Sequence, residues 1–279
     1  MNPANFDFHC HSSVSDGLLP PAELVRRAAS NGVTWLALTD HDDLSGLGEA
    51  AAAAQEAGID FSGGVEISIE WQGIPIHVVG LGIKGDCPQL QAGLQTIRNG
   101  RVERARRMEA SLAAAGIEGC FDGAMRYAEN PSLISRAHFA RYMVEIGIAQ
   151  DTCTIFHHYL TPGKPGYVDH RWATLEESVG WILAAGGVAV VAHPGRYRFA
   201  NGGQRAFLSE FKELGGQGIE VVCGCHGNDN VQHFARLVRH FGLYASRGSD
   251  FHGPEESYID LGKLAALPED LKPVWRLMA

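Results

Sequence analysis

Histidines and acidic residues recur at the ends of the predicted strands of this chain, and the first of them lie in the stretch FDFHCHSSVSDG. His9 and His11 are two residues apart, and Asp16 follows in the next turn. Because strand side chains alternate between faces, the two imidazoles point the same way and can hold one metal ion. A single HxH pair is a weak signal, since a lone strand-end histidine is usually a satisfied polar residue.

Residues of the same types follow the later predicted strands. The whole set is Asp7, His9, His11, Asp40, His41, Asp42, Glu66, His77, His193, Glu220, Asp250 and His252. Active sites of parallel α/β folds form at the carboxyl ends of the strands, so these side chains are expected to converge. Imidazole and carboxylate ligands suit Mn²⁺, Fe²⁺ or Zn²⁺ better than Ca²⁺. The number of ligands predicts two or three ions, with a carboxylate such as Glu66 bridging them.

Short apolar strands alternate with helical segments in two separate parts of the chain. WLALTD, VAVVAHP, GIEVV and LYASRGSD are predicted strands, with helices between them. The stretch DFSGGVEISIEWQGIPIHVVGLG indicates two strands joined by a turn at Gln72–Gly73. Repeated βα units predict a mostly parallel sheet, and their number suits a closed or nearly closed barrel.

Between residues 84 and 170 the alternation gives way to an almost purely helical pattern, with the Pro/Gly-rich loop TPGKPGYV near its end. We therefore predict an α/β fold in which residues 1–83 and 171–279 form the barrel and residues 84–170 form an inserted helical cap. Arg101, Arg104 and Arg107 lie three residues apart on one face of a predicted helix there. This stripe could receive a nucleotide strand, but a solvated helix face is the favoured interpretation, and the stripe is left out of the site.

The composition narrows the class of protein. The chain has 279 residues, of which 45% are hydrophobic and 20% charged, so a sizeable core is expected and disorder is not. The net charge of −9 disfavours binding to duplex DNA but allows a small anionic substrate. Cys223 and Cys225 are expected to be buried free thiols rather than a metal or redox pair. No secretory signal or membrane-spanning segment is predicted, which favours the cytoplasm, and no membrane or obligate protein partner is expected.

The motifs FHCHSSVSDG, LTDHDD, GVEIS, IHVVG, VAHPGR and GSDFHG resemble, in this order, those of the PHP (polymerase and histidinol phosphatase) superfamily. The resemblance runs from residue 7 to residue 252 and implies a distorted (β/α)7 barrel with a trinuclear metal site. It implies three ligand groups, which are His9, His11, Glu66 and Asp250; Glu66, His77 and His193; and Asp16, His41 and His252. Asp16 stands where many members carry histidine. Mn²⁺ is the expected ion, with Fe²⁺ or Zn²⁺ as alternatives.

The resemblance also implies roles in catalysis. Asp40 is expected to orient a ligand or to move a proton, and His193 and Asp250 are placed with it as catalytic residues. The segments ISRAHFAR and TPGKPGYV resemble one branch of the superfamily, the 3′,5′-nucleoside bisphosphate phosphatases. That branch often has Arg-Pro-His where this chain has Arg136-Ala137-His138. The expected reaction removes the 3′-phosphate and leaves a 5′-mononucleotide.

A bisphosphate substrate requires a second anion site away from the metal ions. The candidates are Arg136, His138, Lys164 and Arg196, with Arg247 as a further possibility. Close relatives of the same branch are 5′→3′ exoribonucleases, so short 5′-phosphorylated RNA is the main alternative substrate.

Other functions stay open from the sequence. Another phosphomonoesterase, such as a histidinol phosphatase, would use the same fold and chemistry. An amidohydrolase also carries HxH on its first strand, but the HPGR and SDFHG elements argue against it. A non-catalytic PHP module would have lost ligands, whereas every family ligand position here holds a residue able to bind metal.

Overall fold

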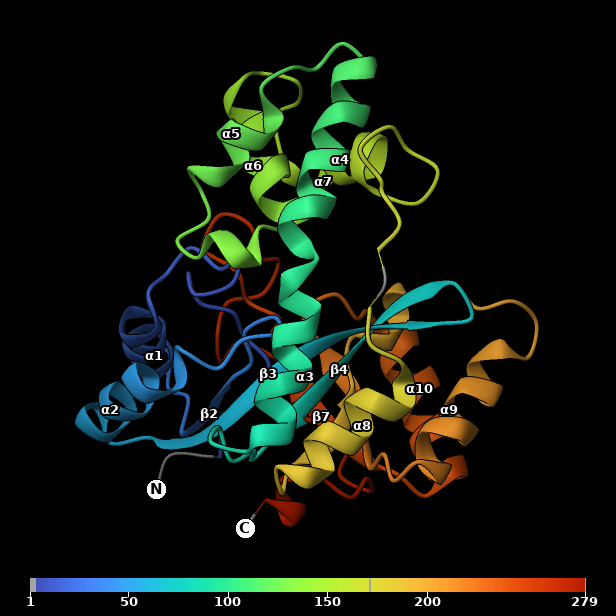
Figure 1. The fold of residues 1–279 in the computed structure, drawn as a ribbon. Coiled ribbons are helices and arrows are strands. Elements are labelled where there is room, and N and C mark those ends of the chain that lie inside the picture. Colours follow the sequence, from blue (N-terminus) through green and yellow to red (C-terminus); the bar gives the residue numbers. More distant parts are fainter. Residues whose placement is uncertain (1–3, 171, 279) are drawn as a thin grey trace.

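A seven-stranded sheet forms the centre of the computed structural model, which describes residues 4–170 and 172–278 (Figure 1). The strands are β1 (Phe6–Asp7), β2 (Trp35–Leu38), β3 (Asp60–Trp71), β4 (Ile74–Leu81), β5 (Val188–Val191), β6 (Gly218–Cys223) and β7 (Tyr244–Gly248). They lie in sequential order, and neighbours are parallel except where β4 pairs with β3 and β5.

The sheet curls until its first and last strands meet. The Phe8 N–H donates to the Arg247 carbonyl at 3.1 Å, and Cys10 forms a parallel bridge with Phe251. The α/β class and the nearly closed barrel predicted from the sequence are thereby confirmed. The antiparallel β4 distorts the barrel. β3 and β4 are joined by the predicted turn, where Gln72 and Gly73 have φ angles of 49° and 76°. Two positive φ values in succession are what a tight type I′ hairpin requires.

Helices pack on the outside of the barrel. They are α1 (Pro21–Ser30), α2 (Leu47–Ala57), α8 (Leu175–Ala184), α9 (Gly203–Glu213) and α10 (Asn228–Phe241). In Figure 1, α1 and α2 lie on one side and α8, α9 and α10 on the other. α8 begins with a capping box between Thr174 and Glu177, and α10 ends at Gly242 in the left-handed conformation. Local sequence therefore determines where α8 begins and where α10 ends.

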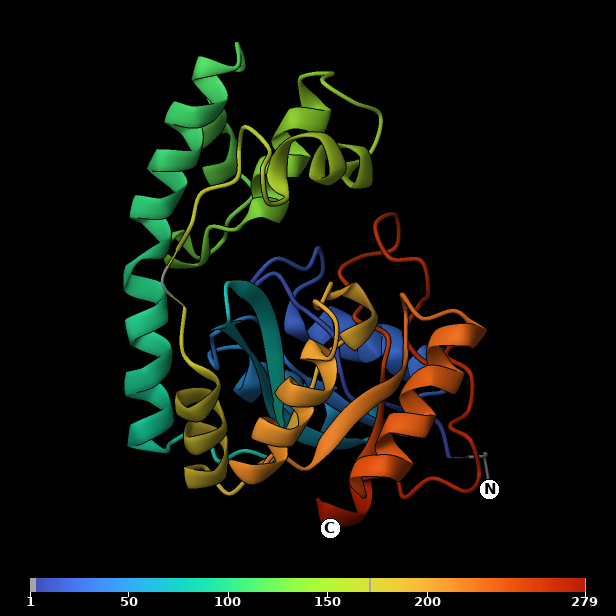
Figure 2. The same ribbon diagram turned by 90° about the vertical axis from the view of Figure 1, so that its right-hand side faces the viewer.

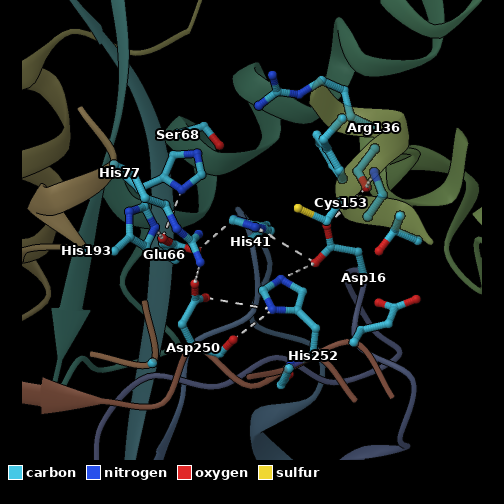
Figure 3. A pocket seen from close by; sticks show the side chains of 18 of the residues that line it. Asp16, His41, Glu66, Ser68, His77, Arg136, Cys153, His193, Asp250 and His252 are labelled. Atoms are coloured by element: carbon cyan, nitrogen blue, oxygen red, sulfur yellow. Dashed lines mark hydrogen bonds and ion pairs between the residues drawn. The ribbon is translucent and has the colours of Figure 1, made fainter. Parts of the chain in front are cut away.

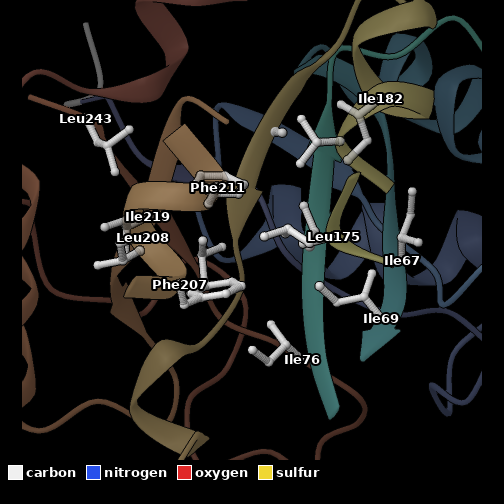
Figure 4. Close-up of a cluster of buried hydrophobic side chains, with 14 of the residues drawn as sticks. Ile67, Ile69, Ile76, Leu175, Ile182, Phe207, Leu208, Phe211, Ile219 and Leu243 are labelled. Carbon is white, nitrogen blue, oxygen red and sulfur yellow. The ribbon is translucent and has the colours of Figure 1, made fainter. Parts of the chain in front are cut away.

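The largest apolar cluster fills the space between the sheet and α8, α9 and α10 (Figure 4). Ile67 and Ile69 of β3, Ile182 of α8, and Phe207 and Phe211 of α9 are buried there. Burying each of these side chains stabilises the fold by about 1.5–3 kcal/mol. This cluster holds the strands whose carboxyl ends carry the polar residues.

The inserted region contains α3 (Pro88–Asn99), α4 (Arg101–Ala114), α5 (Cys120–Met125), η1 (Pro131–Leu133), α6 (Arg136–Glu145), α7 (Thr152–Ile155) and η2 (Phe156–Leu160). α3 and α4 follow each other as a tall column that rises from the barrel to the helices above it (Figures 1 and 2). α4, α5, α6, α7 and η2 share an apolar cluster of their own, which includes Met108, Phe121 and Phe139. We refer to these elements, with η1, as the cap.

The first helix of the insertion packs on the barrel rather than in the cap. Leu90, Leu94 and Ile97 of α3 belong to the barrel cluster. Gly93 allows α3 to approach α8 closely, because a Cβ at this position would lie 2.4 Å from the ring of Trp181. The boundaries predicted at residues 84 and 170 stay a prediction, and the predicted return to the barrel at residue 171 lies outside the described residues.

Over residues 4–170 and 172–278, the structure has no helix that is both long and apolar enough to cross a membrane.

Candidate metal centre and its cavity

The predicted metal ligands meet in one place, at the end of the barrel where its parallel strands finish, and face the cap (Figure 3). They are His9, His11, Asp16, His41, Glu66, His77, His193, Asp250 and His252. Two of them do not lie at the carboxyl ends of strands as predicted: Glu66 is in the middle of β3, and His77 is in the amino-terminal half of the antiparallel β4. The ligand atoms of His9, His11, Glu66 and Asp250 all lie within 4.8 Å of one another, and so do those of His11, Asp16, His41 and His252. These groupings match two of the implied ligand groups, with His11 added to the group of Asp16.

Glu66 lies at the centre of the cluster and is fully buried. Its Oε1 is 2.9 Å from Nδ1 of His77 and 2.8 Å from Nε2 of His193. Its Oε2 is 3.3 Å from Nε2 of His9, 3.2 Å from Nε2 of His11 and 3.0 Å from Nδ1 of His41. One carboxylate thus faces two sets of imidazoles with its two oxygens, which is the arrangement a bridging ligand needs.

Three of the imidazoles are held from behind, so that Nε2 faces the cluster. Nδ1 of His9 lies 2.7 Å from Glu220, and Nδ1 of His252 lies 3.0 Å from the Asp250 carbonyl. Nδ1 of His193 lies 3.1 Å from the hydroxyl of Tyr197. Metal-binding histidines are characteristically fixed in this way through the other ring nitrogen. The sequence places Glu220 at a strand end without indicating this role.

Asp16 turns toward the cluster. Its Oδ1 lies 3.4 Å from Nε2 of His252 and 3.8 Å from Nε2 of His41, while its Oδ2 accepts a hydrogen bond from Ser135 at 3.0 Å. Since Ser135 is the N-cap residue of α6, the cap itself helps to orient Asp16. Asp16 is therefore available to the third ligand group.

Asp40 lies under the loop that carries Asp16. It accepts hydrogen bonds from the Ser12 N–H at 2.8 Å, the Ser12 hydroxyl at 2.6 Å and the Ser15 hydroxyl at 2.6 Å. These contacts fix the loop between β1 and α1. Of the two roles expected for Asp40, the contacts support orienting a ligand, and proton transfer stays a prediction.

Backbone strain is concentrated at the same strand ends. His193 has a φ of 26° and Asp250 a φ of 54°, both in the left-handed region that non-glycine residues rarely adopt. Asp42, with a φ of 52°, accepts hydrogen bonds from both the N–H and the hydroxyl of Ser68. Such conformations cost about 1–3 kcal/mol each and persist where the surrounding structure enforces them, often at functional sites.

The donor set fits divalent metal ions. Asp16 Oδ1, His41 Nδ1 and Glu66 Oε2 are buried, and none has a partner in hydrogen-bond geometry among the described residues, although Glu66 Oε2 lies 3.0 Å from His41 Nδ1. Burial opposes a charge on His11, yet hydrogen bonds to Asp250 and Glu66 raise its pKa to about 10. Burial also opposes ionisation of Glu66, but the imidazoles, His9 foremost, hold its pKa well below the usual range. The buried carboxylates thus require positive charge at their centre, which divalent ions supply.

A cavity of about 470 Å³ lies above the cluster, between the barrel and the cap. Its barrel side is lined by the ligands, and its cap side by residues that include Arg101, Arg104, Arg136 and Phe156. In Figure 3, Arg136 lies across the cavity from the imidazoles. This volume is typical of sites for small-molecule ligands.

Arg101 and Arg104 are the main residues that the sequence analysis missed. Both are buried and line the cavity, whereas Arg107 on the same helix is exposed, so the assignment of the stripe to a solvated face was wrong for its first two members. Arg101 pairs with Asp42, and its guanidinium lies 5.1 Å from the ring centroid of Trp172. The only available signal was the three-residue spacing, which does not reveal which face a helix buries.

Arg104 and Arg136 have no ion-pair partner among the residues that the structure describes. Arg104 donates to the Val168 carbonyl at 3.2 Å and Arg136 to the Leu160 carbonyl at 3.1 Å. Burial, together with the neighbouring arginines, lowers the pKa of Arg104 to about 9. Arg104 is buried and Arg136 is half-buried, and both face the cavity. Two guanidinium groups that repel each other beside a cavity form a binding site for an anion.

The other predicted substrate residues lie in different environments. Arg196 lines the cavity and contacts Asp250 Oδ2 at 2.5 Å. Lys164 is exposed and is not part of the cavity wall. Arg247 donates to the Leu264 carbonyl at 3.0 Å, again outside the cavity wall. The structure therefore brings Arg136 and Arg196 to the site but does not bring Lys164 or Arg247 there.

His138 is buried inside the cap and does not line the cavity, in contrast to its predicted contact with substrate. Its Nδ1 accepts a hydrogen bond from the Ser135 N–H at 3.1 Å, which completes the capping box of α6. Burial lowers the pKa of His138 to about 4, while a hydrogen bond to the Ser15 backbone acts in the opposite direction. His138 thus connects the cap to the loop that carries Asp16. The sequence signal for this role is that His138 lies three residues after Ser135, which is the spacing of a capping box.

This burial makes the stability of the protein depend on pH through His138. The unfolded state takes up a proton below pH 6.5 but the folded state only near pH 4, so stability is lost as the pH falls through that window. Between pH 7.5 and 4.5, the wild type should lose about 2.5 kcal/mol of unfolding free energy more than His138→Asn, which keeps an acceptor for Ser135. Urea unfolding at both pH values measures the difference, with exposed His240→Asn as the control. An equal loss in His138→Asn and wild type would contradict this role.

The chain forms a seven-stranded α/β barrel with imidazoles and carboxylates gathered at one end. This combination of fold and site is typical of metal-dependent hydrolases. Comparison with known proteins identifies the family. The chain belongs to the PHP domain family, whose model matches residues 7–222.

Relatives match over almost the whole chain. It is 55% identical over 273 residues to the 3′,5′-nucleoside bisphosphate phosphatase of Chromobacterium violaceum, and this match covers 98% of this chain and 96% of the relative. It is 43% identical over 271 residues to a 5′-3′ exoribonuclease of Haemophilus influenzae, covering 97% of each. A solved structure, described as an amidohydrolase from Chromobacterium violaceum with bound sulfate and no metal, has a TM-score of 0.96 at 54% identity, with 99% of this chain and 96% of that chain covered.

Proposed function

We propose that this protein is a phosphoric monoester hydrolase that removes the 3′-phosphate from nucleoside 3′,5′-bisphosphates and releases a 5′-mononucleotide and phosphate. The observation that carries the proposal is the two-sided cavity. Glu66 and its surrounding imidazoles form one wall, and Arg136 lies across the cavity from them (Figure 3). Arg104 also lines the cavity, and neither guanidinium has an ion-pair partner among the residues that the structure describes. A substrate with two phosphates complements both walls at once.

The metal residues are proposed to act in the three groups that the family resemblance implies. Glu66 is shared between the group of His9, His11 and Asp250 and the group of His77 and His193. Asp16, His41 and His252 form the third group. We propose Mn²⁺ as the ion, because oxygen and imidazole donors suit it and no thiol belongs to these groups. Divalent ions bound here activate water at neutral pH and neutralise the phosphoryl oxygens.

The residues of the chain have separate tasks in this reaction. His193 has a pKa lowered to about 4 by burial and by Arg196, so its imidazole is neutral and free to act as a ligand. Arg196 is positioned by Asp250 at 2.5 Å, from where its other guanidinium N–H groups can donate to the 3′-phosphate. Asp40 keeps the loop of Asp16 in place through Ser12 and Ser15.

The cap wall is proposed to bind the 5′-phosphate. Arg104 and Arg136 offer guanidinium donors without a competing carboxylate, and Arg101 is held beside them by Asp42. Phe156 lines the same wall, with the guanidinium of Arg136 5.8 Å from its ring centroid. An apolar ring next to the anion seat is suited to contact the nucleoside.

The similarity to the phosphatase of Chromobacterium violaceum supports this activity, because 55% identity extends over 98% of the chain. A second candidate is 5′→3′ cleavage of short 5′-phosphorylated RNA, since relatives at 43% and 38% identity are named 5′-3′ exoribonucleases. Both candidates use the same two walls and differ in how much of the substrate continues beyond the scissile phosphate.

Hydrolysis in Mn²⁺ tests the proposal. The panel contains adenosine 3′,5′-bisphosphate, 3′-AMP, 5′-AMP, histidinol phosphate, a 5′-phosphorylated dinucleotide and a series of amides. Phosphate release measures the phosphomonoesters, and chromatography of the products measures the dinucleotide and the amides, because cleavage of a phosphodiester or an amide frees no inorganic phosphate. We expect kcat/KM for the bisphosphate to exceed that for either monophosphate at least about tenfold, since a charged hydrogen bond to the second phosphate is worth about 1.5–3 kcal/mol. Three results would reject the proposal: a preference for histidinol phosphate, rates on the monophosphates equal to the rate on the bisphosphate, or cleavage of amides alone. Faster cleavage of the dinucleotide would favour the exoribonuclease.

A further inference from the structure

Two cysteines and a histidine gather just after β6, at the same end of the barrel as the proposed metal centre. Cys223 is the last residue of β6, and Cys225 and His226 follow it after Gly224. Gly224 itself lines the cavity. The ligands of the proposed metal centre contain no sulfur, so this cluster is separate from its three ligand groups.

The three side chains face one another. The sulfurs of Cys223 and Cys225 are 3.0 Å apart, and a ring nitrogen of His226 lies within 4.8 Å of both. Cys223 is buried, while Cys225 and His226 are half-buried. The cysteines are free thiols rather than a disulfide.

His226 is oriented as a ligand would be. Its Nδ1 lies 3.0 Å from the Val221 carbonyl, which accepts the ring proton and leaves the lone pair on Nε2. Nε2 accepts a hydrogen bond from the Gly195 N–H at 3.1 Å. Gly195 belongs to η3 (Pro194–Arg196), directly after His193.

The local electrostatics favour a thiolate at Cys225. A hydrogen bond from Cys223 lowers the pKa of Cys225, burial opposes the change, and the positive charge of Arg196 adds to the lowering. The same hydrogen bond, burial and the charge of Glu220 raise the pKa of Cys223, so its proton would leave only on metal binding. Thiolate sulfur and imidazole nitrogen together select Zn²⁺ and similar thiophilic ions over Mn²⁺ or Mg²⁺.

We propose that Cys223, Cys225 and His226 form a second metal site, for one thiophilic divalent ion of the Zn²⁺ type, beside the barrel centre. Two sulfurs and one nitrogen supply three positions of a tetrahedral site, and the fourth is open to solvent on the side of Gly224. Zn–S bonds of about 2.3 Å place the two sulfurs ~3.8 Å apart, so they move apart by less than about 1 Å on binding.

Binding has a consequence for the barrel. The metal takes the Nε2 lone pair of His226 and releases the Gly195 N–H, which now anchors the turn between His193 and Arg196. The site is thus connected to a predicted ligand and to a predicted substrate residue through one hydrogen bond.

Cobalt titration of the reduced, Mn²⁺-loaded protein tests the site. Thiolate coordination to Co²⁺ gives a near-ultraviolet charge-transfer band, which imidazole and carboxylate ligands do not give. We expect the band to saturate at one Co²⁺ per chain, to disappear in Cys223→Ser and in Cys225→Ser, and to persist in Cys153→Ser, where an exposed thiol is removed. No band in the wild type, or an undiminished band in both variants at the cluster, would overturn the proposal.

A second measurement needs only the wild type. Bound Zn²⁺ should protect Cys223 and Cys225, but not Cys153, from iodoacetamide, as read by mass spectrometry of the peptides. Equal alkylation with and without Zn²⁺ would overturn the site even if a serine variant failed to fold. A Cys223–Cys225 disulfide in protein kept under reducing conditions would also reject it and would point to redox chemistry instead.

Discussion

Replacing Glu66 with glutamine is expected to lower kcat/KM for phosphate release by about 10³-fold or more. Glutamine keeps the size and one oxygen but removes the charge that faces five imidazoles, His9, His11, His41, His77 and His193. A lost electrostatic contact at a reacting group typically costs about 10²–10³-fold, and Glu66 faces two ligand groups at once. The bound metal per chain, measured by elemental analysis after reconstitution, should fall along with the rate.

Glu70→Gln is the matched control for this substitution, because Glu70 is an exposed carboxylate on the same strand. It should keep both its rate and its metal content. Glu220→Gln tests the support of His9 separately, and a loss of about 10–100-fold in metal affinity is expected when such a supporting contact is removed. A Glu66→Gln enzyme that retained its metal and acted within tenfold of the wild type would contradict the bridging role.

The second large effect is expected from the cap wall. Arg104→Gln and Arg136→Gln should each lower kcat/KM for adenosine 3′,5′-bisphosphate by about 30-fold, since a charged hydrogen bond to phosphate contributes about 2 kcal/mol. The rate on 3′-AMP should change much less, because that substrate has no 5′-phosphate for the guanidinium groups to bind. Steady-state phosphate release on the two substrates gives the ratio directly.

Arg107→Gln is the control, since it removes an exposed arginine from the same helix, α4. It should leave both substrates unaffected. If Arg104→Gln and Arg136→Gln slowed both substrates equally, the arginines would support the cap rather than recognise the second phosphate, and the assignment of the cap wall would be wrong. Thermal unfolding of each variant shows whether the cap remains folded.

Much of the metal centre can be predicted from the sequence because its information is local. His9 and His11 share a face because strand side chains alternate, and the carboxyl ends of parallel strands meet at one edge. The turn at Gln72–Gly73 and the capping residues of the helices are equally local. Such features depend on a few neighbouring residues, so a linear pattern contains them.

The roles of the cap residues could not be read in this way. A helix with arginines three residues apart has one cationic face, but its sequence does not say whether that face meets water or a cavity. The answer depends on tertiary packing: α3 packs closely on Trp181 at Gly93, and Arg101 and Arg104 at the start of α4 are buried. His138 is a parallel case, since its burial follows from the packing of α6.

The sequence by itself determined the fold class, the succession of strands and helices along the chain and the residues able to hold metal, because alternation, turns and strand ends are short-range properties. Only the tertiary structure decided that Glu66 lies between two sets of imidazoles and that Arg104 and Arg136 face them. It also brought Cys223, Cys225 and His226 within reach of one ion. These arrangements arise from contacts between distant segments, where packing, and not local pattern, determines which side chains share one desolvated space.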